Sequence, residues 1–370
     1  MNNWFDELIK KLPGYFLPFI AVLLAFAFNP PLELQQIENG LWSVQIEQSR
    51  HLSDNNFLED VYYGYNRAMR LFQPLLFKLF QIERPVLAYL LQIVFSVIQM
   101  FLVYAIAKRI LKEEKKNILL FLISCSTLYF ANSAFGDTFG HCDTFGFTFM
   151  LLAMYYPRKW LLSALFLLLG FLCSERVLFV GLISVIIYWY YCTDLSVVKK
   201  KKLIVFSTLV SVLCYFGLKF YMTSLPDFDV SLPIDIGLNY ALNDHTFSQI
   251  YFFTFTGFWI LLMATTSMSR NQLLVLTLPL LLSGTSFLVA DQTRGMAHIF
   301  PVFFVFLYQI QKTWSADTIH KTLNMMLLIC LISPSYNYIG TFNYKPSLFY
   351  YFFEHGVLKN MELVFNMINS

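Results

Sequence analysis

Apolar segments that approach the length of a membrane-spanning helix recur along the chain and are separated by short polar connections. A helix needs ~20 apolar residues to cross the hydrocarbon core of a bilayer. With 57% hydrophobic and only 13% charged residues, the chain is too apolar for a soluble domain of its length. The sequence therefore predicts an all-α, polytopic integral membrane protein with about eleven transmembrane helices. The expected spans are 13–31, 86–107, 118–135, 143–157, 160–174, 177–192, 203–222, 248–267, 272–290, 296–311 and 322–340.

The Lys and Arg residues set the expected orientation, because cytoplasmic loops of membrane proteins are enriched in them. If the N-terminus is cytoplasmic, most of these residues lie in inner connections and the short outer loops carry almost none. Residues 1–370 then form a single transmembrane domain with outer loops at 32–84 and 223–247 and an outer tail at 341–370. The net charge of +3 is small and dispersed, which does not indicate a nucleic-acid partner. The six Cys lie mostly in apolar runs without metal-ligand spacing, so we expect them to pack in the interior.

Ionisable residues gather at the outer ends of several expected helices. Asp137, His141 and Asp143 lie between two apolar segments, and Arg176 and Arg294 occupy two further outer ends. Uncompensated charge at a membrane boundary is costly, so such residues tend to mark function. Because they all fall on one side, we expect them to line a single extracytoplasmic cavity that binds substrate.

Each of these groups also has a purely structural interpretation. Glu175 adjoins Arg176, and Asp291 precedes Arg294 by three residues, so each pair could neutralise itself locally. Asp143 is also a suitable N-cap for the helix that follows it. A His between two Asp residues could act as a general base, or it could only complete a hydrogen-bond network at the helix ends.

The long outer loop 32–84 is polar but punctuated by aromatic and aliphatic residues, a pattern typical of amphipathic helices on a membrane surface. We expect this loop to cover the cavity. The alternative is an interfacial helix whose acids face water and whose aromatic rings lie among the headgroups. In the outer loop 223–247 the acids are unevenly spaced, so no cofactor is indicated and a divalent metal is left open. The candidate catalytic and sugar-stacking residues of the first loop are Asp54, Glu59, Asp60, Tyr62 and Tyr63.

Three short segments resemble a known class of enzymes. The run Phe139–Tyr156 resembles the Gly-Gln-x-Asp segment and the following apolar helix of polytopic glycosyltransferases of the GT-C class, with His141 in place of the usual Gln. Leu168–Val180 is similar to their next helix pair, and Asp291–Arg294 followed by Pro301 resembles the charged segment before a late helix. The resemblance implies an extracytoplasmic active site, an acidic catalytic residue in the amphipathic first loop and a polyprenyl-phosphate sugar donor.

Transfer of a hexosyl or pentosyl group from a lipid phosphate needs a carboxylate that takes the acceptor proton and cations that stabilise the leaving phosphate. Arg176 and Arg294 suit the second role, because Arg recognises phosphate in a bidentate manner. Enzymes of this class often place the acid soon after the first helix, where this chain has two prolines and then Glu33. The base is therefore left open among Glu33, Asp54, Glu59 and Asp60, with Asp143 as the competing assignment.

We therefore expect a membrane glycosyltransferase of cell-envelope glycan biosynthesis that works among membrane lipids. Its acceptor is a glycan, a lipid or a protein on the extracytoplasmic side. The alternatives are a polysaccharide polymerase or ligase that uses lipid-diphosphate glycans, and a lipid or solute transporter. A transporter is expected to contain broken helices and pseudo-repeats, and neither stands out in this sequence. The brevity of the chain and its short loops favour the bacterial inner membrane over the endoplasmic reticulum.

Overall fold

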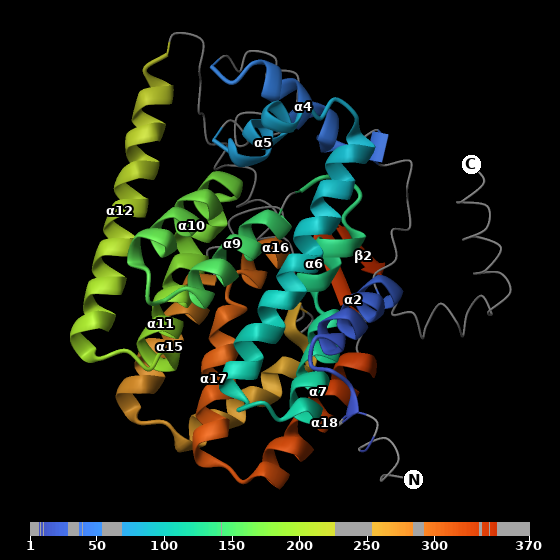
Figure 1. Cartoon of the computed structure of the whole chain (residues 1–370), viewed down its shortest axis with the longest axis vertical. Helices are drawn as coiled ribbons and strands as arrows, with labels where there is room; N and C mark the ends of the chain where they lie inside the picture. Colours follow the sequence, from blue (N-terminus) through green and yellow to red (C-terminus); the bar gives the residue numbers. More distant parts are fainter. Residues whose placement is uncertain are drawn as a thin grey trace, which may run out of the picture.

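The computed structural model describes residues 7, 9, 11–28, 37–38, 40–53, 69–141, 143–225, 254–283, 292–332, 335–339 and 341–345. This part of the chain is overwhelmingly helical, as expected from the apolar segments (Figure 1). The first half contains α2 (Phe16–Phe28), α4 (Leu41–Arg50), α5 (Phe72–Phe80), α6 (Pro85–Ile110), α7 (Lys115–Ser126), α8 (Tyr129–Ala131), η3 (Asn132–Gly136), α9 (Asp143–Tyr155) and α10 (Trp160–Cys173). The second half contains η4 (Val177–Gly181), α11 (Leu182–Cys192), α12 (Val197–Thr223), η5 (Thr256–Ser267), α15 (Arg270–Ser283), α16 (Gln292–Ala297), α17 (Pro301–Thr313) and α18 (Ala316–Ile332).

Local signals explain where several of these helices begin. Pro85 opens α6 after an extended Arg84, because a proline at the first helical position loses no hydrogen bond. The Ser196 hydroxyl caps α12 by accepting a hydrogen bond from the Lys199 amide. At α15 the Gln272 side chain accepts from the Ser269 amide at 2.8 Å and the Ser269 hydroxyl accepts from the Gln272 amide at 3.4 Å, which together form a capping box.

The last expected span, 322–340, is only partly helical. α18 ends at Ile332, and β1 (Ser335–Ile339) pairs antiparallel with β2 (Thr341–Lys345). The two strands are rich in Tyr, Phe, Ile and Thr, which favour extended chain over helix. The expected all-α class is therefore confirmed for the described chain apart from this short hairpin. Its residues continue into the segment that we expected to be the outer tail, and positions 346–370 of that segment lie outside the described residues.

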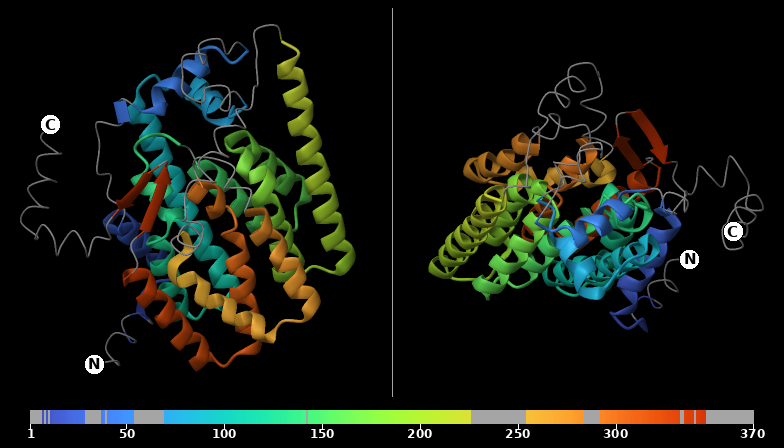
Figure 2. Two further views of the ribbon diagram at one scale, coloured as in Figure 1. Left: turned by 180° about the vertical axis from the view of Figure 1, so that it is seen from behind. Right: turned by 90° about the horizontal axis from the view of Figure 1, so that it is seen from above.

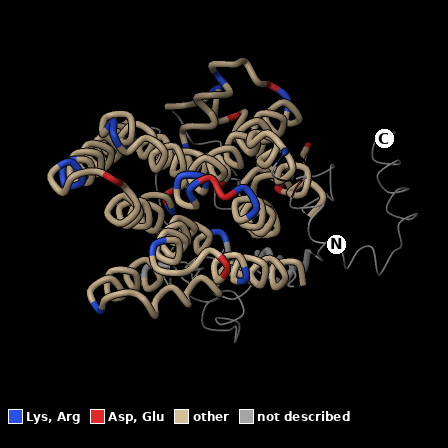
Figure 3. The backbone as a smooth tube through the Cα atoms, turned by 60° about the horizontal axis from the view of Figure 1, so that its bottom comes forward, with Lys and Arg blue, Asp and Glu red and all other residues tan. Residues whose placement is uncertain are grey.

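The helices run in alternating directions, so their connections collect at two ends of the bundle. At one end, here called the basic end, the Arg109 guanidinium of α6 donates to the Tyr155 carbonyl of α9 at 2.8 Å. At the same end the imidazole of His320 in α18 bonds to Asn117 in α7 at 3.0 Å. α4 and α5 lie at the opposite end, here called the site end (Figure 1). Lys and Arg mark many of the connections when the basic end is turned toward the viewer (Figure 3).

Seen from behind, η5, α15, α17 and α18 form the near face of the bundle, and α12 runs along its edge (Figure 2). Aromatic rings join this face to the centre. Phe130 stacks on Phe300 with ring centroids 4.3 Å apart, and Phe121 contacts both Phe258 and Phe304. The core is therefore largely apolar and aromatic.

The expected span 118–135 is broken. The axes of α7 and of the segment Tyr129–Gly136 differ by 71°, and residues 132–136 form a π-helical turn. Buried polar side chains of α6 accompany the break: Ser96 donates to the Ala134 carbonyl at 2.6 Å and Tyr89 to the Phe135 carbonyl at 3.0 Å. Irregular backbone in an apolar surrounding persists where such groups are satisfied by protein. A broken helix is thus present in this chain, although the sequence did not indicate one.

Two described helices, α6 and α12, are long and apolar enough to cross a membrane, and a third span results if the bent pair counts as one. The other apolar helices are shorter, with 10 to 17 residues in each of those found at 16–28, 160–173, 177–192 and 256–267. A helix of that length does not reach across a full hydrocarbon core by itself. Helical elements occupy the expected positions, but the described structure does not establish about eleven spans.

Candidate functional site

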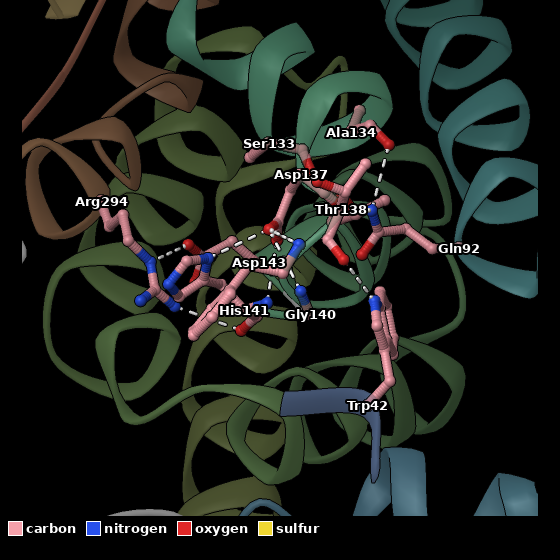
Figure 4. A network of polar contacts seen from close by, with 12 residues as sticks. Trp42, Gln92, Ser133, Ala134, Asp137, Thr138, Gly140, His141, Asp143 and Arg294 are labelled. Carbon is pink, nitrogen blue, oxygen red and sulfur yellow. Dashed lines mark hydrogen bonds and ion pairs between the residues drawn. The ribbon is translucent and has the colours of Figure 1, made fainter. Parts of the chain in front are cut away.

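A cluster of charged side chains lies at the site end, where several elements meet. Asp143 is the first residue of α9, Arg176 lies between α10 and η4, and Arg294 lies in α16. Asp137 and His141 belong to the turn that joins η3 to α9 (Figure 4). The structure therefore brings together five residues that the sequence analysis selected, across more than 150 positions of sequence.

Asp143 is the centre of the cluster and pairs with two arginines. Its Oδ2 accepts a hydrogen bond from Arg294 Nε at 2.5 Å, and its Oδ1 accepts from Arg294 Nη2 at 3.2 Å (Figure 4). Arg176 Nη1 lies 3.6 Å from the same Oδ1. Asp143 and Arg294 are each 1% exposed, whereas Arg176 keeps 17% of its side chain exposed. The Arg294 pair has the two-pronged geometry of a strong, buried ion pair, and Arg176 is the more accessible cation.

The turn before α9 is built around the Asp137 carboxylate. It accepts hydrogen bonds from the backbone amides of Phe139, Gly140 and His141, at 3.2, 3.2 and 2.9 Å. His141 Nδ1 lies 3.0 Å from Asp137 Oδ1. Burial raises the pKa of the Asp137 carboxyl, but His141 and Arg294 together with these hydrogen bonds outweigh burial and hold that pKa below its usual value. Asp137 therefore remains ionised and orients the His141 ring, so that Nε2 of that ring faces away from the carboxylate.

Helix α4 of the first loop docks on this turn. The Trp42 indole donates to the Thr138 carbonyl at 2.8 Å, and the Gln45 amide donates to the Gly140 carbonyl at 2.8 Å. Gly140 has φ +91°, and a Cβ there would lie 2.9 Å from the Trp42 ring. A glycine is thus required both by the backbone conformation and by the close approach of the ring. The described part of the loop is thus anchored to the turn that carries Asp137 and His141.

Gly140→Ala is expected to lower the free energy of unfolding by ~1–3 kcal/mol, because it combines backbone strain with a clash against Trp42. Gly217→Ala is the matched control: no atom lies within 4 Å of its added Cβ, and Ala is favoured over Gly inside α12. Thermal unfolding in detergent, followed by circular dichroism, measures both variants. Equal melting temperatures for Gly140→Ala and wild type would show that α4 does not depend on this contact.

His298 is a member of the cluster that the sequence analysis did not select. It is fully buried, and its ring stacks on Phe147 with centroids 4.6 Å apart. Nδ1 donates to the Arg294 carbonyl at 2.8 Å, and among the described residues Nε2 has no hydrogen-bond partner. His298 follows Arg294 by four positions. This spacing from a candidate Arg was the one sequence signal that could have selected it. A buried imidazole with an open acceptor atom is a suitable partner for a ligand hydroxyl or a water molecule.

The structure also bears on the alternative pairings. Arg176 contacts Asp143, 33 positions earlier, and the Glu175 carboxyl lies close to the Tyr215 hydroxyl of α12. Asp291 lies outside the described residues, so its expected pairing with Arg294 stays a prediction. The same holds for the first-loop candidates and for most of the loop 223–247. The candidates outside the described residues are Glu33, Asp54, Glu59, Asp60, Tyr62 and Tyr63.

Within the described ranges, no group of three or more His, Cys, Asp or Glu side chains is arranged to hold a metal ion. Comparison of the chain with protein-family models, with curated proteins and with solved structures gave no match.

Proposed function

We propose that the protein is a multi-pass membrane protein whose site end faces the extracytoplasmic side, as in the bacterial inner membrane. The exposed surface supports this placement, because helices α12 and α15 carry apolar side chains on their outer faces. Monomeric soluble proteins rarely expose apolar patches of such extent. The basic end, which carries the connecting Lys and Arg residues, then lies in the cytoplasm. The exposed apolar residues of α12 include Val205, Phe206, Leu209, Leu213, Phe216 and Phe220.

Within that membrane placement we propose a glycosyltransferase that moves a sugar from a polyprenyl-phosphate donor to an extracytoplasmic glycan, lipid or protein. The observation that carries the proposal is the convergence of Arg176 and Arg294 on Asp143 at the site end. A departing lipid phosphate needs preorganised cations in a site of low dielectric constant. An Arg at this depth can meet a lipid headgroup without crossing the hydrocarbon core.

The two arginines have different roles in this proposal. Arg294 is 1% exposed and donates two hydrogen bonds to Asp143, so it holds the cluster together. Arg176 is 17% exposed and lies 3.6 Å from the carboxylate, so it can turn toward a phosphate. Asp143 keeps both guanidinium groups in place and is poorly suited to accept a proton, because its charge is already compensated. In this proposal the proton acceptor is an acid of the first loop or the imidazole of His141.

Arg176→Gln is expected to weaken binding of a polyprenyl-phosphate sugar by about tenfold or more, because a charge-assisted contact to phosphate is lost. The measurement is a binding titration of the purified protein in detergent with a short-chain donor. Arg158→Gln, on an exposed connection at the basic end, is the matched control and is expected to bind as wild type. Undiminished binding by Arg176→Gln would remove the basis of the proposal. Tighter binding of a lipid diphosphate than of the monophosphate would favour a polymerase or ligase.

A transporter is the second candidate, and the break between α7 and α8 favours it. Transporters commonly use discontinuous helices to form a substrate site. The two functions differ in outcome: a transferase releases free lipid phosphate, and a transporter moves its substrate across a vesicle membrane unchanged. Proteoliposomes loaded with donor and acceptor distinguish them, because only the transferase forms a new glycosidic bond.

A further inference from the structure

A second feature suited to an anion lies at the basic end, far from the charged cluster. It is a cavity of about 200 Å³ between α11, α12, α15 and α17. Its rim carries ammonium, hydroxyl and amide groups, and its floor is apolar. The lining residues used below are Tyr191, Lys200, Leu276, Val305, Tyr308 and Lys312.

The charge around this cavity is predominantly positive. Lys200 is half-buried and donates to the Tyr190 carbonyl at 2.9 Å, which fixes its ammonium at the rim. Lys312 is exposed, and no described residue forms an ion pair with it. One carboxylate, Asp194, lies close enough to Tyr308 to affect it electrostatically. The two lysines that line the cavity thus outnumber this carboxylate.

The floor of the cavity continues into an apolar surface. Leu276 and Val305 are buried at 3% and 2% exposure, and they separate the rim from the bundle core. From there the outer face of α15 presents large apolar side chains: Leu274, Val275, Leu278 and Leu281. A ligand that matches both parts has an anionic head beside the lysines and hydrocarbon chains along α15.

A neighbouring cavity at the same end fits an anion less well. It is lined by Lys108, Arg109 and Lys112, but Lys108 pairs with Glu113 at 3.2 Å. Arg109 stacks over the Tyr155 ring at 3.9 Å. Two of its three cations thus already have partners, and the Glu113 carboxylate also lines it, whereas no carboxylate of the described residues lines the first cavity.

We propose that the cavity between α11, α12, α15 and α17 binds the phosphate headgroup of an anionic phospholipid from the cytoplasmic leaflet. Lys200 and Lys312 contact the phosphate, and the tyrosine hydroxyls at the rim donate hydrogen bonds to its oxygens. Basic pockets between membrane helices on the cytoplasmic side suit such headgroups, since the leaflet there is rich in anionic lipid. The proposal rests on the membrane placement above and not on the transferase activity.

The test is native mass spectrometry of the detergent-purified chain, which measures how much added lipid stays bound. Phosphatidylglycerol and phosphatidylcholine are added separately, and inorganic phosphate is added as a competitor. Wild type is expected to retain phosphatidylglycerol about tenfold more strongly than phosphatidylcholine. The double variant Lys200→Gln/Lys312→Gln is expected to lose this preference while still retaining phosphatidylcholine. The matched control Lys201→Gln/Lys202→Gln removes the same charge from exposed positions outside the cavity and is expected to behave as wild type.

Three results would overturn the site. They are an unchanged preference in the Lys200/Lys312 variant, an equal loss in the control, and displacement of the lipid by inorganic phosphate at matched concentration. Failure to retain any phospholipid would instead contradict the membrane placement. Equal retention of both lipids by wild type leaves that placement intact and refutes only the anionic-lipid site.

Discussion

Asp143→Asn is expected to lower the free energy of unfolding by ~3–5 kcal/mol, because it leaves two arginines beside a group that no longer balances their charge. Both partners of the Asp143–Arg294 pair are 1% exposed, so water does not compensate the loss. Thermal unfolding of the purified protein in detergent, at fixed pH and salt, measures the change. The expected result is a fall of several degrees in the midpoint of unfolding.

Asp317→Asn is the matched control for this prediction. Asp317 pairs with Lys321 at 2.6 Å, but the two side chains are 70% and 75% exposed, so the pair is expected to contribute little. A double variant of Asp143→Asn with Arg294→Gln should be less destabilised than the sum of the single variants, because it removes both members of the buried pair. Additive effects would show that the two residues do not act as a pair.

Loss of the catalytic base is expected to lower turnover by about 10²-fold or more while donor binding persists. We expect this result for one of three single variants in the first loop. Each variant replaces one of the acids that lie close in sequence to the tyrosines. An amide keeps the shape and hydrogen bonding of the side chain but removes its basicity. The measurement is single-turnover sugar transfer to an excess of acceptor, with donor binding measured in parallel. The three variants are Asp54→Asn, Glu59→Gln and Asp60→Asn.

Two variants in the charged cluster test other residues as the catalytic base. His141→Gln removes the imidazole that Asp137 orients at 3.0 Å, and Asp143→Asn removes the paired carboxylate. If all three loop variants remain active and only His141→Gln loses turnover, the base is the imidazole of His141. If only Asp143→Asn loses turnover at a temperature where it remains folded, the base is Asp143. Either outcome contradicts the assignment to the first loop.

Parts of the site were predictable because their signals are strong and local. An Asp, His or Arg inside an otherwise apolar chain stands out without knowledge of its neighbours. The selection of Asp137, His141, Asp143, Arg176 and Arg294 therefore required only the printed sequence, and the structure brings all five together. Their partners were less predictable. Arg294 was expected to have a local alternative three residues away, yet it bonds to a carboxylate 151 positions earlier.

The residues that the sequence analysis did not select share a physical reason. Trp42 and Gln45 hold the turn before α9 through contacts across 96 and 95 positions, which no local pattern encodes. His298 resembles an ordinary buried histidine until the fold shows its Nδ1 bonded to the Arg294 carbonyl and its Nε2 without a hydrogen-bond partner among the described residues. Ser96 lies inside the expected apolar span 86–107, and only the fold shows that its hydroxyl donates a hydrogen bond to the Ala134 carbonyl of the broken helix.

The sequence by itself determined the helical class and the approximate positions of the apolar helices. These properties follow from hydropathy and charge along short stretches, where each residue contributes independently of the fold. The tertiary structure alone decided the 71° break after α7, the hairpin after α18 and the pairing of Asp143 with two arginines. Those features depend on which distant groups can satisfy a buried carbonyl or a buried charge, and that is settled only when the helices pack together.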